Sequence, residues 1–137
     1  MNPQSTRQRV LIVDDNEEAR ALLRLYLKRL DVQVSEAEDG LKALDALRDG
    51  RPHLILLDLD MPNLDGFGFL ERRGAVSDWQ PPVVILSARL DDAARERALT
   101  LGAVDYFEKT GAVATQLLPL IRKWLVEAER FLSRETA

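Results

Sequence analysis

The chain reads Val10-Leu-Ile-Val-Asp-Asp15 close to its N-terminus. Four apolar residues lie between Arg9 and a pair of aspartates. A short apolar run bounded by charged residues is typical of a strand that is buried on both faces. Strands of this kind form parallel sheets whose two faces are covered by helices. This segment therefore predicts the interior of a parallel sheet, with an acidic pair where the strand ends.

Short strand-like segments, mostly apolar runs, alternate with amphipathic stretches five times along the chain. Residues 32–36 alternate only weakly, which suits a strand nearer an edge of the sheet. We predict strands over residues 10–13, 32–36, 53–57, 83–86 and 104–107, and helices over 16–30, 39–49, 65–73, 91–101 and about 115–133. Asp39 and Asp91 are expected as N-caps, Gly50 and Gly102 just beyond helix ends, and Pro119 in the first turn of the last helix. This alternation predicts a doubly wound α/β fold, a flavodoxin-like (βα)5 unit with strand order 2-1-3-4-5.

The composition limits the classes of function. The 137 residues contain no cysteine and one histidine, His53, and carry a net charge of −4. Thiolate chemistry, disulfides and zinc ribbons are excluded, and any histidine-based site would have to be built around His53. The acidic balance offers no general attraction to nucleic acid or anionic lipid, and no apolar run is long enough to cross a membrane. We expect a cytoplasmic protein with a single domain over residues 1–137 and its core at about 8–130.

Polar side chains follow the predicted strands at the edge where ligands bind in open α/β sheets. Asp14 and Asp15 follow the first strand, Asp58 and Asp60 the third, Ser87 the fourth, and Lys109 ends the fifth. In the predicted strand order the first and third strands are neighbours. Asp14, Asp15 and Asp58 are therefore expected in one small volume, with a hydroxyl and an ammonium group opposite them.

Clustered carboxylates repel one another unless a cation compensates them, and Mg²⁺ prefers one or two carboxylates together with water and phosphate oxygens. We expect Asp15 and Asp58 as direct ligands and Asp14 as a ligand through water. Lys109 would add a second positive charge, which suits the transfer of a phosphoryl group. Asp58 would then be the nucleophile that forms an aspartyl phosphate, and Ser87 would hydrogen-bond a phosphoryl oxygen.

Each of these residues also has a purely structural interpretation. Two aspartates before a helix are usually an N-cap and a partner of the helix dipole. A single lysine such as Lys109 is mostly solvated, and Ser87 alone carries no information. The functional interpretation is favoured because each residue lies at the end of a different strand, at the same edge of the sheet.

Four segments together carry a resemblance to a known family. They are Leu11-Ile-Val-Asp-Asp15, Leu56-Leu-Asp-Leu-Asp-Met-Pro-Asn-Leu-Asp-Gly66, Ile85-Leu-Ser-Ala88 and Gly102-Ala-Val-Asp-Tyr-Phe-Glu-Lys109. In order and spacing they resemble the receiver domain of bacterial two-component response regulators, over roughly residues 8–130. The resemblance implies Asp58 as the phosphoacceptor and a Mg²⁺ held by Asp15, Asp58 and the backbone carbonyl of Asp60, with Asp14 completing the acidic pair.

The resemblance also implies a switch and its partners. Ser87 matches the family's hydroxyl position, Lys109 its lysine, and Tyr106 its switch aromatic. The phosphoryl donor would be a histidine kinase or a histidine phosphotransfer protein. The output would be a downstream protein or a dimer partner, bound through the fourth helix, fifth strand and fifth helix. The resemblance implies no nucleic-acid or membrane contact within this chain, and no organic cofactor.

Two features leave alternatives open. The stripe on the last helix is wide, so Trp124, Phe131 or Leu132 could either pack on the sheet or stay partly exposed for a partner. The function could also be that of an unphosphorylated pseudo-receiver, although the full residue set argues against it. A haloacid-dehalogenase-type phosphatase is a further alternative, but its Asp-x-Asp motif follows the first strand, whereas Asp58 and Asp60 follow the third.

The sequence departs from the family after the lysine, where Thr110 and Gly111 replace the usual proline. A cis bond before a residue other than proline costs about 3–4 kcal/mol. We therefore predict a trans Lys109–Thr110 peptide bond, and an experimental structure that shows a cis bond there would contradict this prediction. Arg89 and Asp60, two residues beyond Ser87 and Asp58, occupy positions that set the phosphoryl lifetime in the family.

Overall fold

A computed structural model describes residues 7–88, 91–109 and 113–136. Its five parallel strands are ordered β2-β1-β3-β4-β5, which confirms the predicted fold class and strand order. The strands are β1 Gln8–Val13, β2 Val32–Ala37, β3 Leu54–Leu57, β4 Val83–Ser87 and β5 Asp105–Glu108. The helices are α1 Glu17–Leu27, α2 Gly40–Gly50, α3 Gly66–Val76, α4 Asp92–Thr100 and α5 Val113–Thr136.

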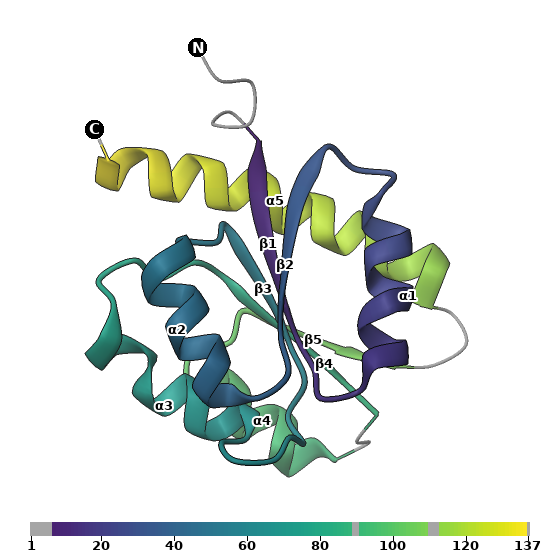
Figure 1. The fold of residues 1–137 in the computed structure, drawn as a ribbon, viewed down its shortest axis with the longest axis vertical. Coiled ribbons are helices and arrows are strands. Elements are labelled where there is room, and N and C mark those ends of the chain that lie inside the picture. The colour runs from purple at the N-terminus through teal and green to yellow at the C-terminus, as the bar shows by residue number, and fades with distance from the viewer. Residues whose placement is uncertain (1–6, 89–90, 110–112, 137) are drawn as a thin grey trace.

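The sheet separates two hydrophobic clusters, as Figure 1 shows by the placement of the helices on its two sides. Along β1, Val10 and Ile12 face the cluster formed with α1 and α5. Leu11 and Val13 face the cluster formed with α2, α3 and α4. Successive side chains of a strand point to opposite faces, so a strand between two helical layers must be apolar throughout. This requirement is the physical reason for the continuous apolar runs in the sequence.

Side chains that precede the helices set their N-terminal ends. Asp39 accepts a hydrogen bond from the backbone N–H of Lys42, and Asp91 accepts from Ala93 and Ala94, which confirms both predicted caps. Asp65 caps α3 in the same way through the N–H of Gly68. Each carboxylate satisfies a backbone donor that the first turn of a helix leaves free and also favours the positive end of the helix dipole.

Two residues expected to mark helix ends, Gly50 and Pro119, lie elsewhere in their helices. Gly50 is the last residue of α2, and the C-cap in left-handed conformation is Arg51, at φ 42°. Pro119 lies inside α5, which begins at Val113, so the proline is beyond the first turn in which we expected it. Burial of Leu117 and Ile121 against the sheet extends this helix on both sides of the proline. Apolar packing of one helix face is thus enough to offset the hydrogen bond that proline cannot donate.

The apolar stripe of α5 mostly packs on the sheet. Leu117, Leu118, Ile121, Leu125 and Ala128 are buried. Trp124 is half-buried, and its indole N–H donates to Asp105 Oδ2 of β5 at 3.1 Å. The side chains of Phe131 and Leu132 lie outside the described residues, as do Arg89 and the Lys109–Thr110 bond. In the described part of the chain, no helix combines the length and the apolar character that a membrane span requires.

The register of the sheet places the ends of β1 and β3 side by side. Val13 pairs with Leu57, and the backbone N–H of Asp58 donates to the carbonyl of Val13 at 2.9 Å. Asp14 and Asp58 are the next residues of these two strands, so their backbones leave the sheet at the same level.

The chain then returns across this end of β3 at Gly66, the first residue of α3. Its backbone N–H donates to the carbonyl of Leu59 at 3.0 Å. A Cβ atom at Gly66 would lie 2.6 Å from the carbonyl oxygen of Asp58 and 2.9 Å from the Cα of Leu59. Only glycine permits this approach of two backbone segments.

We expect Gly66→Ala to lower the free energy of unfolding by about 1–3 kcal/mol, because the added methyl group overlaps backbone atoms that can move only together with Asp58. Gly74→Ala in the same helix is the matched control. A Cβ there meets nothing within 4 Å, so the better helix propensity of alanine should raise stability by up to about 1 kcal/mol. Urea denaturation of both variants measures this difference, and equal effects would contradict the close approach.

Candidate functional site

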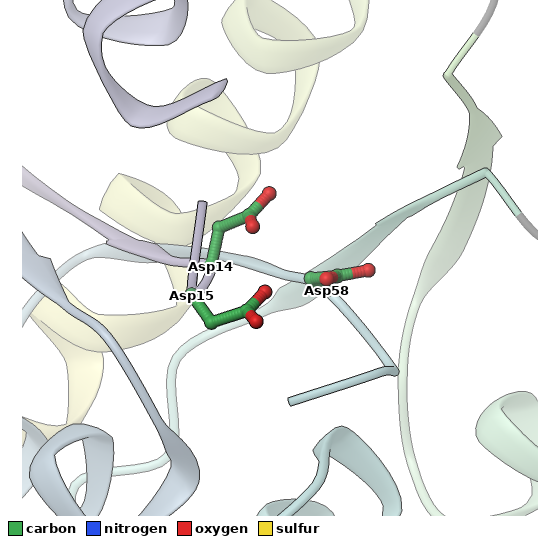
Figure 2. A group of neighbouring side chains, drawn as sticks. All are labelled: Asp14, Asp15 and Asp58. Carbon is green, nitrogen blue, oxygen red and sulfur yellow. The ribbon is translucent and has the colours of Figure 1, made fainter. Parts of the chain in front are cut away.

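Three carboxylates gather where β1 and β3 end. Asp14, Asp15 and Asp58 each offer an oxygen, and these oxygens lie within 4.8 Å of one another. Figure 2 shows the three side chains in this arrangement. Asp14 is buried, Asp58 is partly buried and Asp15 is exposed. The structure thus brings together the three residues that the sequence predicted to converge, with one of them open to solvent.

Asp14 is held at every polar atom. Its backbone N–H donates to the carbonyl of Ala37 at 3.1 Å, and its own carbonyl accepts from Arg20 at 2.7 Å. Its carboxylate accepts at Oδ1 from the backbone N–H of Asn16 at 3.0 Å and at Oδ2 from Lys109 Nζ. A carboxylate that is 2% exposed needs such partners, because an unpaired buried charge is costly.

The surroundings of Asp58 disfavour its charged form. Burial raises its pKa to about 6, Lys109 opposes the rise, and Asp14 adds to it. The backbone N–H of Asp60 hydrogen-bonds the Asp58 carboxylate and acts in the lowering direction. A partly buried carboxylate with such a raised pKa is typical of a site that binds a cation or takes part in a reaction.

Lys109 directly follows β5 and reaches across the end of the sheet. Its backbone N–H donates to the carbonyl of Ser87 at 2.9 Å. Its ammonium group forms an ion pair with Asp14, and its positive charge also acts to lower the pKa of Asp58. Asp14 is the more buried of the two carboxylates, so pairing there compensates the more costly charge.

The remaining predicted residues lie around this centre. Ser87 is fully buried as the last residue of β4. Tyr106 is half-buried in β5, next to Ile85 of β4, and packs against the cluster formed with α2, α3 and α4. The Asp60 side chain is exposed, and its carboxylate is not one of the three clustered groups found among the described residues. His53 accepts from the backbone N–H of Arg9 at 2.9 Å and packs edge-on against Trp79, which is a structural role away from the carboxylates.

Sequence reasoning missed two residues that touch Asp14. Asn16 caps α1 through its side chain, which accepts from the N–H of Ala19, while its backbone N–H binds the Asp14 carboxylate. Arg20, in the second turn of α1 counted from this cap, binds the Asp14 carbonyl. An asparagine before a helix is a recognisable capping signal. No sequence signal distinguishes Arg20 from other helix-surface arginines.

The donor set fits a hard divalent cation. All three groups are carboxylate oxygens, the ligands that Mg²⁺ prefers, and Asp15 is accessible from solvent. The three potential negative charges face one lysine, which is already paired with Asp14. A divalent cation between Asp15 and Asp58 would remove the repulsion that the fold imposes.

Comparison with known proteins shows the family. The response regulator receiver domain matches residues 10–120 of the chain. The chain belongs to the response regulator receiver domain family. Receiver domains are signalling phosphoacceptors. In this receiver domain the clustered carboxylates lie at the ends of β1 and β3.

The curated relatives of this receiver domain are longer proteins. It is 41% identical over 105 residues to a protein-glutamate methylesterase/protein-glutamine glutaminase of Methanospirillum hungatei JF-1, a match that covers 74% of this chain and 30% of the relative. It is 36% identical over 117 residues to the response regulator MprA of Mycobacterium sp. strain KMS, which covers 85% and 50%. The chain thus spans half or less of these curated relatives.

One solved structure is informative about the acidic centre. The receiver domain of a sensor histidine kinase from Pseudomonas aeruginosa PAO1 has a magnesium ion coordinated in its active-site cleft. It is 26% identical to this receiver domain, with a TM-score of 0.77, and the match covers 88% of this chain and 98% of that chain.

The raised pKa of Asp58 gives a stability test in the presence of EDTA. Because the folded-state pKa is about 6 and the ordinary value is 3.8, the folded state binds the proton more tightly. Stability is therefore lost as pH rises from about 4 to about 6, and the loss stays constant above that range. We expect Asp58→Asn to raise the free energy of unfolding at pH 7.5 by about 1–2 kcal/mol after solvent screening, with little effect below pH ~4.

Urea denaturation across this pH range measures the effect. Asp78→Asn is the control, because Asp78 is exposed and lies in the loop between α3 and β4. A pH-independent difference between wild type and Asp58→Asn would contradict the electrostatic cost assigned to Asp58.

Proposed function

We propose that this receiver domain accepts a phosphoryl group on Asp58 from a phosphohistidine of a histidine kinase or a histidine phosphotransfer protein. The observation that carries the proposal is the position of Asp58. Its carboxylate is partly buried beside two further carboxylates, at the edge of the sheet where Ser87 ends β4 and Lys109 follows β5. Membership of the family and the magnesium ion in the active-site cleft of the Pseudomonas neighbour support the same role.

The transfer is a substitution at phosphorus. An Asp58 carboxylate oxygen forms a bond to phosphorus, and the P–N bond to the donor imidazole breaks. The imidazole keeps the electron pair and takes up a proton, while Asp58 becomes an acyl phosphate. Asp58 reacts as the carboxylate, which is the predominant form at neutral pH because its pKa is about 6.

The other site residues stabilise the transferred group. Asp14, Asp15, Asp58 and the backbone carbonyl of Asp60 are the proposed ligand set for Mg²⁺, with Asp14 acting through water. When bound, Mg²⁺ neutralises negative charge on the phosphoryl oxygens and orients them. Lys109 turns from Asp14 toward the phosphoryl group, and Ser87 donates its hydroxyl to a phosphoryl oxygen. The domain loses the phosphoryl group slowly by its own hydrolysis and does not turn over an external substrate.

The phosphoryl group then changes the packing between β4 and β5. Movement of Ser87 toward it vacates space into which the Tyr106 ring rotates. The backbone bond from Lys109 to Ser87 joins the two strand ends, so a shift at one is passed to the other. Two packings whose balance depends on one local charge form a population switch.

The proposed output surface is made of α4, β5 and α5. The hydrogen bond between Trp124 and Asp105 joins α5 to β5, so a rearrangement of β5 would also move α5. A downstream protein or a second copy of the chain would bind there, which suits a domain that signals through altered protein contacts.

Phosphorylation by acetyl phosphate tests the proposal. With Mg²⁺ present, we expect wild type to gain the mass of one phosphoryl group, in a form that hydroxylamine removes, because an acyl phosphate reacts with this nucleophile. Asp58→Asn should gain none. An exposed aspartate away from the site provides the control, since Asp78→Asn retains Asp58 and should still be labelled. Intact-mass spectrometry measures the gain.

Other outcomes would favour the alternative functions. Wild type that stays unlabelled with Mg²⁺ would indicate a pseudo-receiver. Hydrolysis of p-nitrophenyl phosphate over many turnovers, lost in Asp58→Asn, would indicate a phosphatase.

A further inference from the structure

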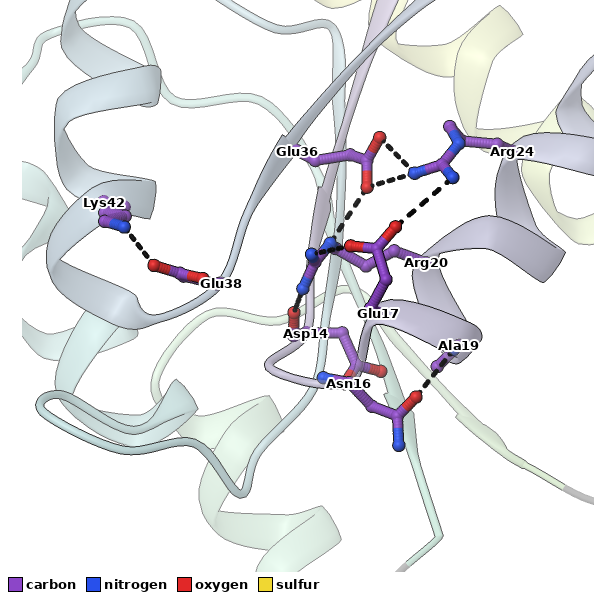
Figure 3. Close-up of polar contacts among 9 residues, drawn as sticks. All are labelled: Asp14, Asn16, Glu17, Ala19, Arg20, Arg24, Glu36, Glu38 and Lys42. Carbon is purple, nitrogen blue, oxygen red and sulfur yellow. Dashed lines mark hydrogen bonds and ion pairs between the residues drawn. The ribbon is translucent and has the colours of Figure 1, made fainter.

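One guanidinium group joins three segments behind the acidic centre. Arg20 of α1 donates through one terminal nitrogen to the backbone carbonyl of Asp14 at 2.7 Å and through Nε to Glu36 of β2 at 2.9 Å. Its other terminal nitrogen pairs with Glu17 in the first turn of α1. Figure 3 shows these contacts. The Arg20 side chain is 12% exposed, so this geometry is held within the protein and not at a mobile surface.

The bond to Asp14 fixes the peptide group between Asp14 and Asp15. The carbonyl of Asp14 belongs to the same planar unit as the N–H of Asp15, so the bond sets the direction in which Asp15 leaves the strand. Asp15 itself is exposed and makes no side-chain hydrogen bond with the described part of the protein. Its carboxylate is nevertheless part of the cluster within 4.8 Å. The position of the Asp15 carboxylate is therefore set by the backbone, because no side-chain hydrogen bond to the described residues holds it.

Arg24 offers a natural comparison one turn further along α1. It pairs with the same two acids, donating to both oxygens of Glu36 at 2.6 Å and approaching Glu17 at 3.5 Å. It carries the same charge as Arg20, but its hydrogen bonds and ion pairs within the described residues go to Glu36 and Glu17 and not to Asp14. The difference between the two arginines is the bond to the Asp14 carbonyl.

We propose that Arg20 is a positioning residue, which holds the Asp14–Asp15 peptide group so that the three carboxylates present a preformed divalent-cation site. The inference rests on the proposed function, because it assigns to Arg20 the preorganisation of the Mg²⁺ ligands. The effect is geometric, since Glu17 and Glu36 already balance the charge of Arg20 and Arg24. Groups that orient metal ligands from behind typically change metal affinity when they are removed.

Isothermal titration of the full chain with MgCl₂ tests the role. We expect Arg20→Gln to weaken Mg²⁺ binding by about tenfold, the lower end of the effect for residues that orient ligands. Arg24→Gln should change it by less than about twofold, because it removes the same charge without touching Asp14. Urea denaturation of both variants in EDTA reports separately on stability. A purely structural role would lower the unfolding free energy and leave the Mg²⁺ affinity of the folded protein unchanged.

The outcomes separate this inference from the proposed function. Equal Mg²⁺ affinity in Arg20→Gln and Arg24→Gln, with wild type binding Mg²⁺ and accepting phosphate, would overturn the role of Arg20 alone. Wild type that neither binds Mg²⁺ nor becomes labelled would overturn both. If Arg20→Gln does not fold, the pair Arg20→Lys and Arg24→Lys replaces it. Lysine keeps the charge but lacks the three separate donor nitrogens with which Arg20 contacts Asp14, Glu17 and Glu36. A selective loss of Mg²⁺ affinity in Arg20→Lys therefore supports the role, and equal affinity overturns it.

Discussion

Repulsion among three carboxylates is the constraint on which the site depends. The backbone bond from Asp58 to Val13 sets β1 and β3 in register, so Asp14 and Asp58 must leave the sheet together. Asp15 follows Asp14, and the oxygens of all three come within 4.8 Å. Lys109 compensates the most buried charge. Burial, with a smaller contribution from the Asp14 charge, raises the pKa of Asp58 to about 6. The fold thus holds unfavourable charges together at the edge of the sheet where a bound ligand can compensate them.

The rest of the structure keeps these charges in place. The central strands β1, β3 and β4 are buried between two helical layers, and polar groups gather where these strands leave that interior. Gly66 allows the start of α3 to lie directly against the carbonyl of Asp58. On the other side, Arg20 and Asn16 of the α1 segment hold the backbone and the carboxylate of Asp14. Contacts on both sides therefore oppose a movement of the strand ends that would separate the carboxylates.

The features that the sequence predicted are those that a periodic pattern or a strand end encodes. Buried parallel strands need apolar residues on both faces, which made the fold class predictable. The strand order followed from the usual flavodoxin-like arrangement of a chain of this size, and that order placed Asp14 beside Asp58. Features that depend on tertiary contacts were missed. The partner of Lys109 is decided by relative burial, and the role of Arg20 by the approach of α1 to β2. Pro119 lies inside α5 because packing against the sheet outweighs a local helix-breaking preference.

The central claim is that a divalent cation relieves the repulsion built into the folded site. The most direct measurement is the free energy of unfolding of wild type, by urea denaturation, as a function of Mg²⁺ concentration at constant ionic strength. A cation that binds only the folded state raises this free energy with the logarithm of its concentration once the site begins to fill. The account predicts such a rise at pH 7.5. A free energy of unfolding that stays constant from EDTA to saturating millimolar Mg²⁺ would contradict it.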